Sequence, residues 1–473
     1  MRLLDGDPTA VAPEKLAVQV ARRIEHEIIE RHWPIGEVLG SETALREQFG
    51  VSRSILREAV RLLELHRVAH MRQGPGGGLV VSSPDPRSAI RALVIYLEYI
   101  GVSVEQLVRA RSIVEPTAVS TVSDSLTERG IRELRSVASK PHRGHLDTFH
   151  LEMGRLTGNP ALELFVEILT RLTATYTHRA LQLSPDADRA HLEEPQRRHQ
   201  AITDAVVAGD VSRAQNELSE DLGEIAAWLS RFVDPVPGDR TATRPTDPDP
   251  DERPSGKLAE SLAGRIHDDI VAESRNVGEV LGTEADFVTR YGVSRSIFRE
   301  AVRILEHYSV ARMRRGQGGG LVVLEPDPTS SIRMVVLYLG FRGVTAEHLR
   351  AVRDVIELGC LTVVMRAGTV DRADLTTDRP GGGSATLCRC SVGLRDRIEM
   401  LTGDGVLMLL RSILAVLWDE FGSEPSHVES CRPEAGEPDV QKELDAIVDA
   451  MVAGDEVLAR HRMRRHLRAH VGL

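Results

Sequence analysis

The chain has 473 residues, a hydrophobic content of 41% and a net charge of −11. It is long for one domain, and an aromatic content of only 4% with few alternating β-branched runs predicts several mostly α-helical domains. The N-terminus has no apolar core of a signal peptide, and no apolar run reaches the roughly 18 residues of a membrane span, so we expect a cytoplasmic protein without a membrane partner.

The first 83 residues predict three helices and a hairpin. An amphipathic pattern covers 14–31, a short helix over 42–49 ends at Gly50, and a third helix begins after Ser52. In the third helix, steps of four place Arg53, Arg57 and Arg61 on one stripe, opposite an apolar face. The following RVAHMRQGPGGGLVVS predicts strand, glycine loop and strand, which together indicate a winged helix-turn-helix.

Helical periodicity then continues to about residue 232 and predicts a bundle of roughly seven helices. Residues 233–256 are rich in Pro and Asp and lack apolar periodicity, which predicts a linker. As a coil, this linker would span roughly 25 to 30 Å. A winged helix-turn-helix typically binds DNA, and adjacent half-sites on one face of DNA lie about 34 to 36 Å apart. The linker is therefore compatible with the segments before and after it binding adjacent half-sites.

The second half repeats the first. GVSRSILREAVRLLELH at 50–66 returns as GVSRSIFREAVRILEHY at 292–308, with 13 of 17 positions identical. The Arg stripe returns as Arg295, Arg299 and Arg303, and the wing as SVARMRRGQGGGLVVL. In the second bundle, TTDRPGGGSATLCRC stands where the first has helix, and its Pro and Gly should break one. We therefore predict two winged domains (13–83 and 257–325), each followed by a bundle (84–232 and 326–473).

A guanidinium on such a helix can read guanine or clamp a phosphate in the major groove, although a lone Arg stripe is also typical of a solvated helix face. Each winged domain carries ten Lys or Arg and nine acids, at 14–82 and 257–324, so the remainder carries −13. Acidic residues therefore concentrate away from the stripes, which allows a local cationic face. The glycine loops lack the Lys and Ser or Thr of a phosphate-binding loop, so wing turns are favoured.

GEVLGSE, VSRSILREAV and GGGLVV, and their second copies GEVLGTE, VSRSIFREAV and GGGLVV, resemble the GntR family of bacterial transcription regulators. The resemblance implies double-stranded DNA as the partner. It differs in one respect, since Thr43 and Ala285 stand where family members often carry another DNA-contacting Arg. The residues expected to contact DNA are Ser52, Arg53, Ser54, Arg57, Arg61 and Gly74, with Ser294, Arg295, Ser296, Arg299, Arg303 and Gly316.

The first bundle resembles the FCD ligand-binding domain of the FadR branch of this family through RARSIVE, FHLEMGRLTGNPAL and RRHQAITDAVVAGDVSRA. The resemblance implies metal ligands at His150 and His199, with Asp221 in place of a third His. The family's Asp falls on Leu146, and Asp147, one position off and about 100° around a helix, is kept as a further candidate ligand. Such a set suits Zn, Ni or Mn. Alternatively, the two histidines are partly buried polar residues that line an acid pocket with Arg111.

The second bundle has drifted further. Arg395, Leu444 and His466 occupy the corresponding positions, so we expect no metal there. Arg395, with Arg353, could instead hold an anionic group directly, or the pocket could be vestigial. No cofactor other than the one divalent metal is expected.

Two hypotheses follow. In the first, the chain is a transcription regulator, a repressor, whose winged domains bind a near-palindromic operator as an intramolecular pseudo-dimer and whose bundles respond to a small organic acid. Homologues usually dimerise through such bundles, so a homodimer with four winged domains is also open. In the second, the chain is a metal-dependent hydrolase or lyase that uses His150, His199 and Asp221. The retained Arg stripes favour the regulator, because catalysis does not need them.

Overall fold

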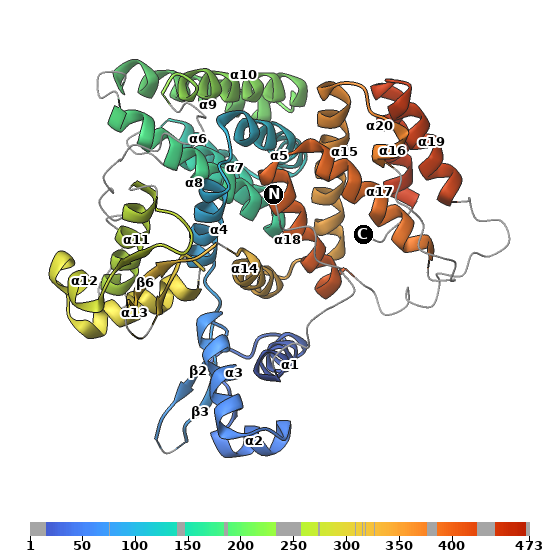
Figure 1. Cartoon of the computed structure of the whole chain (residues 1–473). Coiled ribbons are helices and arrows are strands. Elements are labelled where there is room, and N and C mark those ends of the chain that lie inside the picture. The colour runs from blue at the N-terminus through green and yellow to red at the C-terminus, as the bar shows by residue number, and fades with distance from the viewer. Residues whose placement is uncertain are drawn as a thin grey trace. The chain divides into compact units, whose positions relative to one another are not determined.

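The computed structural model describes residues 16–139, 147–183, 188–232, 257–375, 386–422 and 440–469, apart from positions 75, 273–274, 308, 315, 317 and 326. Over these residues the chain is mostly helical, with two small three-stranded antiparallel sheets (Figure 1), which confirms the predicted fold class. It divides into two compact units, one of Met1–Ala89 with Thr329–Gly343 and the other of Ile90–Pro328 with Val344–Leu473. The predicted linker at 233–256 lies outside the described residues.

Winged domain 1, in the first unit, has the three predicted helices and the predicted hairpin. Its elements are α1 (Leu16–Glu30), β1 (Val38–Gly40), α2 (Glu42–Phe49), α3 (Arg53–Leu65), β2 (Ala69–Arg72) and β3 (Gly78–Val81). The strand β1 was not predicted. It pairs antiparallel with β3, so the strand order is β1-β3-β2. Three residues are too few to show the alternation from which a strand is recognised.

The turn between α2 and α3 follows from local chemistry. Gly50 ends α2 in the left-handed region (φ 63°), which glycine adopts without steric cost. Ser52 then caps α3 by accepting a hydrogen bond from the backbone N–H of Ile55 at 3.4 Å. Leu56 and Leu63 on α3 are completely buried in the core of the domain. The opposite side of α3, which carries the arginines, is left facing outward.

Winged domain 2, in the second unit, repeats this arrangement. Its elements are α11 (Lys257–Ala272), β4 (Val280–Gly282), α12 (Glu284–Tyr291), α13 (Arg295–His307), β5 (Ala311–Arg314) and β6 (Gly320–Val323). The strand order β4-β6-β5 and the pairing of each strand correspond to those of winged domain 1. Gly292 again ends the first helix of the turn in the left-handed region, at φ 64°. The second half of the chain therefore repeats the winged helix-turn-helix in structure as well as in sequence.

A bundle of helices follows each winged domain. The first has α4 (Arg87–Tyr99), α5 (Val104–Ser125), α6 (Glu128–Ala138), α7 (Thr148–Leu156), α8 (Pro160–Leu183), α9 (Asp188–Val207) and α10 (Val211–Leu229). The second has α15 (Ala346–Ala367), α16 (Arg372–Leu375), α17 (Thr386–Thr402), α18 (Gly405–Phe421), α19 (Val440–Val452) and α20 (Glu456–Ala469), and α14 (Thr329–Phe341) precedes it. The helix break was predicted from the Pro and Gly run at 380–383, which lies outside the described residues, and α17 begins after it at Thr386.

The two bundles pack on each other within the second unit, and they do so reciprocally. Asn159, which caps α8 of the first bundle, donates a hydrogen bond from its Nδ2 to the carbonyl of His348 on α15 at 3.0 Å. Asp404, which caps α18 of the second bundle, lies 3.4 Å from Arg109 on α5. Between them α5 packs on α15, where Gly359 leaves room for the side chain of Ile113. Equivalent elements exchange equivalent contacts, as they do across a two-fold interface.

None of the described helices is both long enough and apolar enough to cross a membrane.

Candidate nucleic-acid interface and metal centre

The three arginines of α3 are exposed. The exposed fractions of their side chains are 61% for Arg53, 65% for Arg57 and 66% for Arg61. Glu42, the last residue of GEVLGSE, pairs with Arg53 and Arg57: its Oε1 accepts from Arg53 Nε at 2.7 Å and lies 3.5 Å from Arg57 Nε. Such exposed ion pairs are weak and are easily exchanged for a phosphate or a base edge.

Winged domain 2 presents the same surface. The exposed fractions are 76% for Arg295, 66% for Arg299 and 64% for Arg303. Glu284 occupies the place of Glu42 and lies 3.2 Å from Arg299 and 4.0 Å from Arg295. The arginines of both stripes therefore do not pack in the cores of their domains.

The other residues predicted to contact DNA lie at the start of α3 and α13 and in the two wings. Ser52 and Ser54 hydrogen-bond to each other at 2.9 Å at the start of α3, and Ser294 and Ser296 do the same at the start of α13. Gly74 and Gly316 turn the two wings with φ of 98° and 100°. In each wing an arginine donates to a loop carbonyl at 3.0 Å, Arg72 to Gly76 and Arg314 to Gly318. The described residues of the two wings thus share the same turn and the same hydrogen bond.

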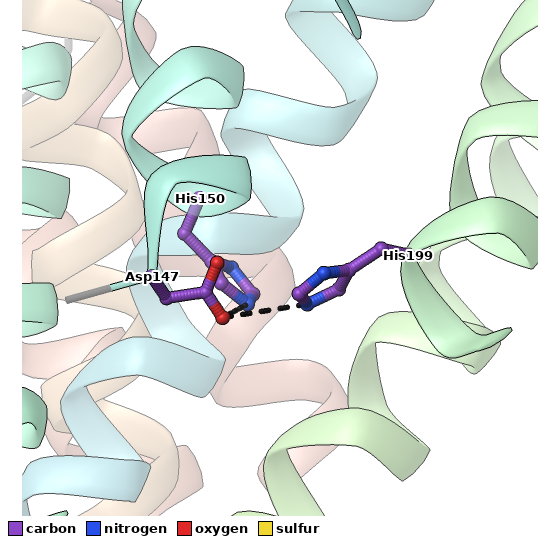
Figure 2. Close-up of side chains that lie close together, drawn as sticks. All are labelled: Asp147, His150 and His199. Atoms are coloured by element: carbon purple, nitrogen blue, oxygen red, sulfur yellow. Dashed lines mark ion pairs between the residues drawn. The ribbon is translucent and has the colours of Figure 1, made fainter. Parts of the chain in front are cut away.

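A second cluster lies inside the first bundle. Asp147, His150 and His199 each turn a ligand atom toward one point, and these atoms lie within 4.8 Å of one another (Figure 2). The Oδ2 of Asp147 is 3.6 Å from Nε2 of His150 and 3.4 Å from Nε2 of His199. Both histidines are almost completely buried, and the ring of Phe149 stacks on that of His199 at 4.2 Å.

Asp147 reaches the cluster because it precedes α7. It is the N-cap of α7, and its Oδ1 accepts from the backbone N–H of Phe149 at 2.9 Å while Oδ2 faces the histidines. The expectation that Asp147 would be rotated away by one helical step is therefore wrong, because the helix begins only at Thr148. An N-cap residue has extended backbone, so the angular step of a helix does not apply to it.

Asp221, on α10, also lies beside the cluster of Asp147, His150 and His199. It is buried, and its Oδ2 lies 3.3 Å from Nε2 of His150. Apart from this ion pair, neither atom has a hydrogen-bond partner. Once the imidazole is neutral, Nε2 and Oδ2 would face each other as two acceptors, and a bound cation would satisfy both atoms. Two imidazoles and two carboxylates suit Zn, Ni or Mn, so the residues present fit a divalent metal.

Glu115, on α5, orients His150 and was not predicted. Its Oε2 lies 2.7 Å from Nδ1 of His150, and its Oε1 accepts from Nε of Arg111 at 2.5 Å. A carboxylate behind a histidine fixes the tautomer that points Nε2 at a metal. Arg111 and Glu115 lie four residues apart in RARSIVE, which places them on one helix face, and this spacing is the signal that could have revealed Glu115.

The buried charges shift the pKa values of Glu115 and His150 in opposite directions. Burial alone would raise the pKa of Glu115, but Arg111 and His150 outweigh it and lower the pKa to about 2. Burial alone would lower the pKa of His150, but the carboxylates of Glu115 and Asp147 outweigh it and raise the pKa to about 10. A metal would bind in competition with the proton of His150.

A small pocket adjoins the cluster. Besides Glu115 and His150 it is lined by apolar side chains, which are Ala118, Val119, Phe149, Met153, Val166, Ile202 and Leu218. The Nη2 of Arg111 is buried without a hydrogen bond, whereas its Nη1 donates to Thr173 at 3.2 Å. The structure therefore brings together the predicted residues Asp147, His150, His199 and Asp221, with the guanidinium of Arg111 bound to Glu115 next to them.

The second bundle arranges its predicted residues differently. Arg395, in the place of His150, is buried with its Nη1 4.0 Å from Glu357, the counterpart of Glu115. Arg353 does not follow Arg111: its Nη2 donates to Asp354 at 2.7 Å and to the carbonyl of Leu467 at 2.9 Å. Burial raises the pKa of Glu357 even though Arg395 and Arg411 lie close by. Here an arginine of the chain occupies the position that His150, a candidate metal ligand, holds in the first bundle.

Comparison with known families identifies the first half. Residues 16–79 match the family described as bacterial regulatory proteins, gntR family, and residues 106–224 match the FCD domain. The first half of the chain therefore contains a segment similar to the gntR family, followed by a segment similar to the FCD domain. The matched family is one of regulatory proteins, not of enzymes. The cluster of Asp147, His150 and His199 lies inside the FCD domain and is consistent with a metal site in it.

Individual GntR relatives match parts of the chain. The Exu regulon transcriptional regulator of Escherichia coli is 25% identical over 163 residues, which are 33% of this chain and 62% of the relative, so the chain spans under two thirds of that relative. The Uxu operon regulator of Haemophilus influenzae is 23% identical over 235 residues, 46% of this chain and 82% of the relative. The HTH-type transcriptional regulator LutR of Bacillus subtilis is 25% identical over 212 residues, 42% and 94% respectively.

Solved structures are similar as well. A GntR protein of Streptococcus agalactiae matches with a TM-score of 0.31 and 19% identity over 45% of this chain and 99% of that one. The McbR/YncC protein of E. coli matches with a TM-score of 0.25 and 20% identity over 46% and 97%.

Proposed function

We propose that the chain is a sequence-specific transcription regulator, a repressor, whose two winged domains bind the two halves of a near-palindromic operator in double-stranded DNA. The observation that carries the proposal is the pair of exposed arginine stripes on α3 and α13. Each lies on the second helix of a helix-turn-helix, and its arginines pair with glutamates of the same winged domain: Glu42 and Glu58 for α3, and Glu284 and Glu300 for α13. Arginines in this position reach base edges or phosphates when the helix lies in the major groove.

We propose further that the chain is a tandem duplication of one regulator of the FadR branch. The repeated order of elements supports the proposed domains at 13–83, 84–232, 257–325 and 326–473. The match to LutR supports the duplication, since it covers 94% of that regulator but 42% of this chain. The repetition extends from the strand pairing of the two sheets to the Gly-Val-Ser turn before α3 and before α13, which we call the reading helices.

One chain then supplies what two chains supply in a dimer. The reciprocal contacts of α8 with α15 and of α18 with α5 resemble an isologous interface, although both sides belong to one chain. An intramolecular pseudo-dimer presents two winged domains without any dependence on protein concentration, because the second domain is tethered to the first.

The effector of the regulator is proposed to be a small organic acid that binds in the first bundle. When a divalent metal is bound by Asp147, His150, His199 and Asp221, it supplies a Lewis-acidic centre for a carboxylate. Nη2 of Arg111, buried without a hydrogen bond, can donate to the same carboxylate. The enzyme alternative would use the same cluster, and no feature of the described residues favours it over a regulatory ligand site. In the second bundle Arg395 pairs with Glu357, so we propose that no metal binds there.

The test is selection from a random DNA pool with the whole chain at near-physiological salt, followed by sequencing of the enriched fragments. The expected result is two short inverted half-sites at one spacing, with one chain bound per site. Two separated palindromes would show that two chains pair, which contradicts the pseudo-dimer. No enrichment, with all binding lost as salt rises, would refute sequence reading. Transcription in vitro from the selected site then decides whether the protein represses.

A further inference from the structure

Helix α14, which follows winged domain 2 in sequence, completes the core of winged domain 1. Leu337 on α14 is completely buried among the core residues of winged domain 1. Phe341 contacts Trp33 edge to face with 5.6 Å between ring centroids. Arg333 donates from Nε and Nη2 to Oε2 of Glu25 on α1, at 2.9 and 2.8 Å. These contacts all lie within the first compact unit, although 308 residues separate Arg333 from Glu25 in sequence.

Helix α4, which follows winged domain 1 in sequence, packs on winged domain 2. Ile95 on α4 packs against the buried core of winged domain 2. The guanidinium of Arg91 lies against Gly264 on α11, where an added Cβ would meet its Nη2 at 2.5 Å. Both partners belong to the second compact unit. Ile95 and Arg91 precede Leu337 and Arg333 by the same 242 residues (337 − 95 and 333 − 91), so the two exchanges use the same positions of the repeat.

The far end of α4 is fixed to the first bundle. Glu98 pairs with Arg179 on α8 at 3.0 Å, and the hydroxyl of Tyr176, also on α8, donates to the carbonyl of Val102 in the turn between α4 and α5. Helix α5 then carries Arg111 and Glu115, which hold His150 of the candidate metal centre. A continuous series of packed helices therefore runs from that centre to winged domain 2.

We propose that the two repeats are cross-connected: the helix that follows each winged domain in sequence packs on the winged domain of the other repeat. The first bundle acts on winged domain 2 through α4, while α14, which precedes the second bundle in sequence, completes winged domain 1. Since the cluster of Asp147, His150 and His199 lies in the first bundle, occupation of this site alters winged domain 2 before winged domain 1. This last step rests on the proposed ligand site, whereas the exchange of helices does not.

The exchange is tested by amide hydrogen exchange on the whole chain without DNA. Leu337→Ala should speed exchange in α1 and α3 by at least about 30-fold, because it empties a fully buried site, and should leave α11 and α13 unchanged. Ile95→Ala, the matched variant in the other repeat, should speed exchange in α11 and α13 by at least about 5-fold and leave α1 and α3 unchanged, since Ile95 is only partly buried. Acceleration in the winged domain of the same repeat, in both domains or in neither would overturn the proposal.

The coupling is tested by adding Zn²⁺ alone, with His150→Ala as the control that removes a ligand. Zinc should slow exchange in α4, α11 and α13 at least about 3-fold more than in α1 and α3, and the His150→Ala chain should show no change. Equal slowing in both winged domains, or slowing confined to α5, α7 and α9, would overturn the coupling. Absence of zinc binding would refute the proposed metal centre and with it this coupling, while the two alanine variants would still decide the exchange of helices.

Discussion

Replacement of one reading arginine in each winged domain tests the proposed DNA contacts. We expect Arg57→Ala and Arg299→Ala each to weaken binding to the selected operator by about 1 to 3 kcal/mol, or roughly 5- to 150-fold. The two side chains are 65% and 66% exposed and pair only with Glu42 or Glu284, so the free energy of unfolding should change by less than about 0.5 kcal/mol. Loss of affinity would therefore report a lost contact and not a damaged domain.

Fluorescence anisotropy with labelled operator at several salt concentrations measures the effect and separates its two sources. A base contact predicts relaxed preference at one position in each half-site, whereas a phosphate contact predicts uniform weakening and a salt slope smaller by about 0.9. Arg129→Ala is the matched control, because Arg129 is 79% exposed and pairs with Glu133 on α6, in the bundle. Unchanged affinity in both reading-helix variants, or an equal loss in the control, would refute the assignment of α3 and α13.

Three further outcomes are expected. His150→Ala should abolish Zn²⁺ binding in calorimetry and Glu115→Gln should weaken it roughly 10- to 100-fold, and full affinity in the latter would exclude an orienting role. Burial would raise the pKa of Glu25, but His66 and Arg333 lower it below 4.5, so its stabilisation is complete above that pH and is lost as pH falls further. Thermal unfolding of winged domain 1 should show this loss, and Glu25→Gln should reduce the pH dependence to the part contributed by other carboxylates such as Asp85. Gly78→Ala should cost about 1 to 3 kcal/mol in denaturant unfolding, because the added Cβ would lie 2.4 Å from the carbonyl of Gly40, whereas Gly223→Ala meets nothing within 4 Å.

Local sequence was sufficient for the reading helices. The Gly50 turn, the Ser52 cap and the four-residue spacing of the arginines act within a few residues of one another, and the structure shows all three where they were expected. The predicted histidines were likewise correct as neighbours, since the resemblance to FCD domains supplied a long-range relation that periodicity does not contain. Whether the arginines and histidines bind DNA and metal stays a prediction.

The failures have a different origin. Strand β1 consists of three residues whose only strand partner is β3, about 40 positions later, so it leaves no local pattern. The rotation assigned to Asp147 depended on a helix boundary, and boundaries are the least certain part of a pattern. Glu115 is an ordinary helical glutamate until packing places His150 beside it.

By itself, the sequence determined the element types, the repeat and the two outward arginine stripes, because helix caps, turns and amphipathic faces depend on neighbours along the chain. Only the tertiary structure decided which carboxylates surround His150 and His199, and that α14 completes the core of winged domain 1 while α4 packs on winged domain 2. Both repeats offer nearly the same apolar helix to nearly the same core, and local pattern cannot distinguish the two pairings. The choice between them rests on contacts between residues far apart in the chain, such as Leu337 and Arg333 with α1.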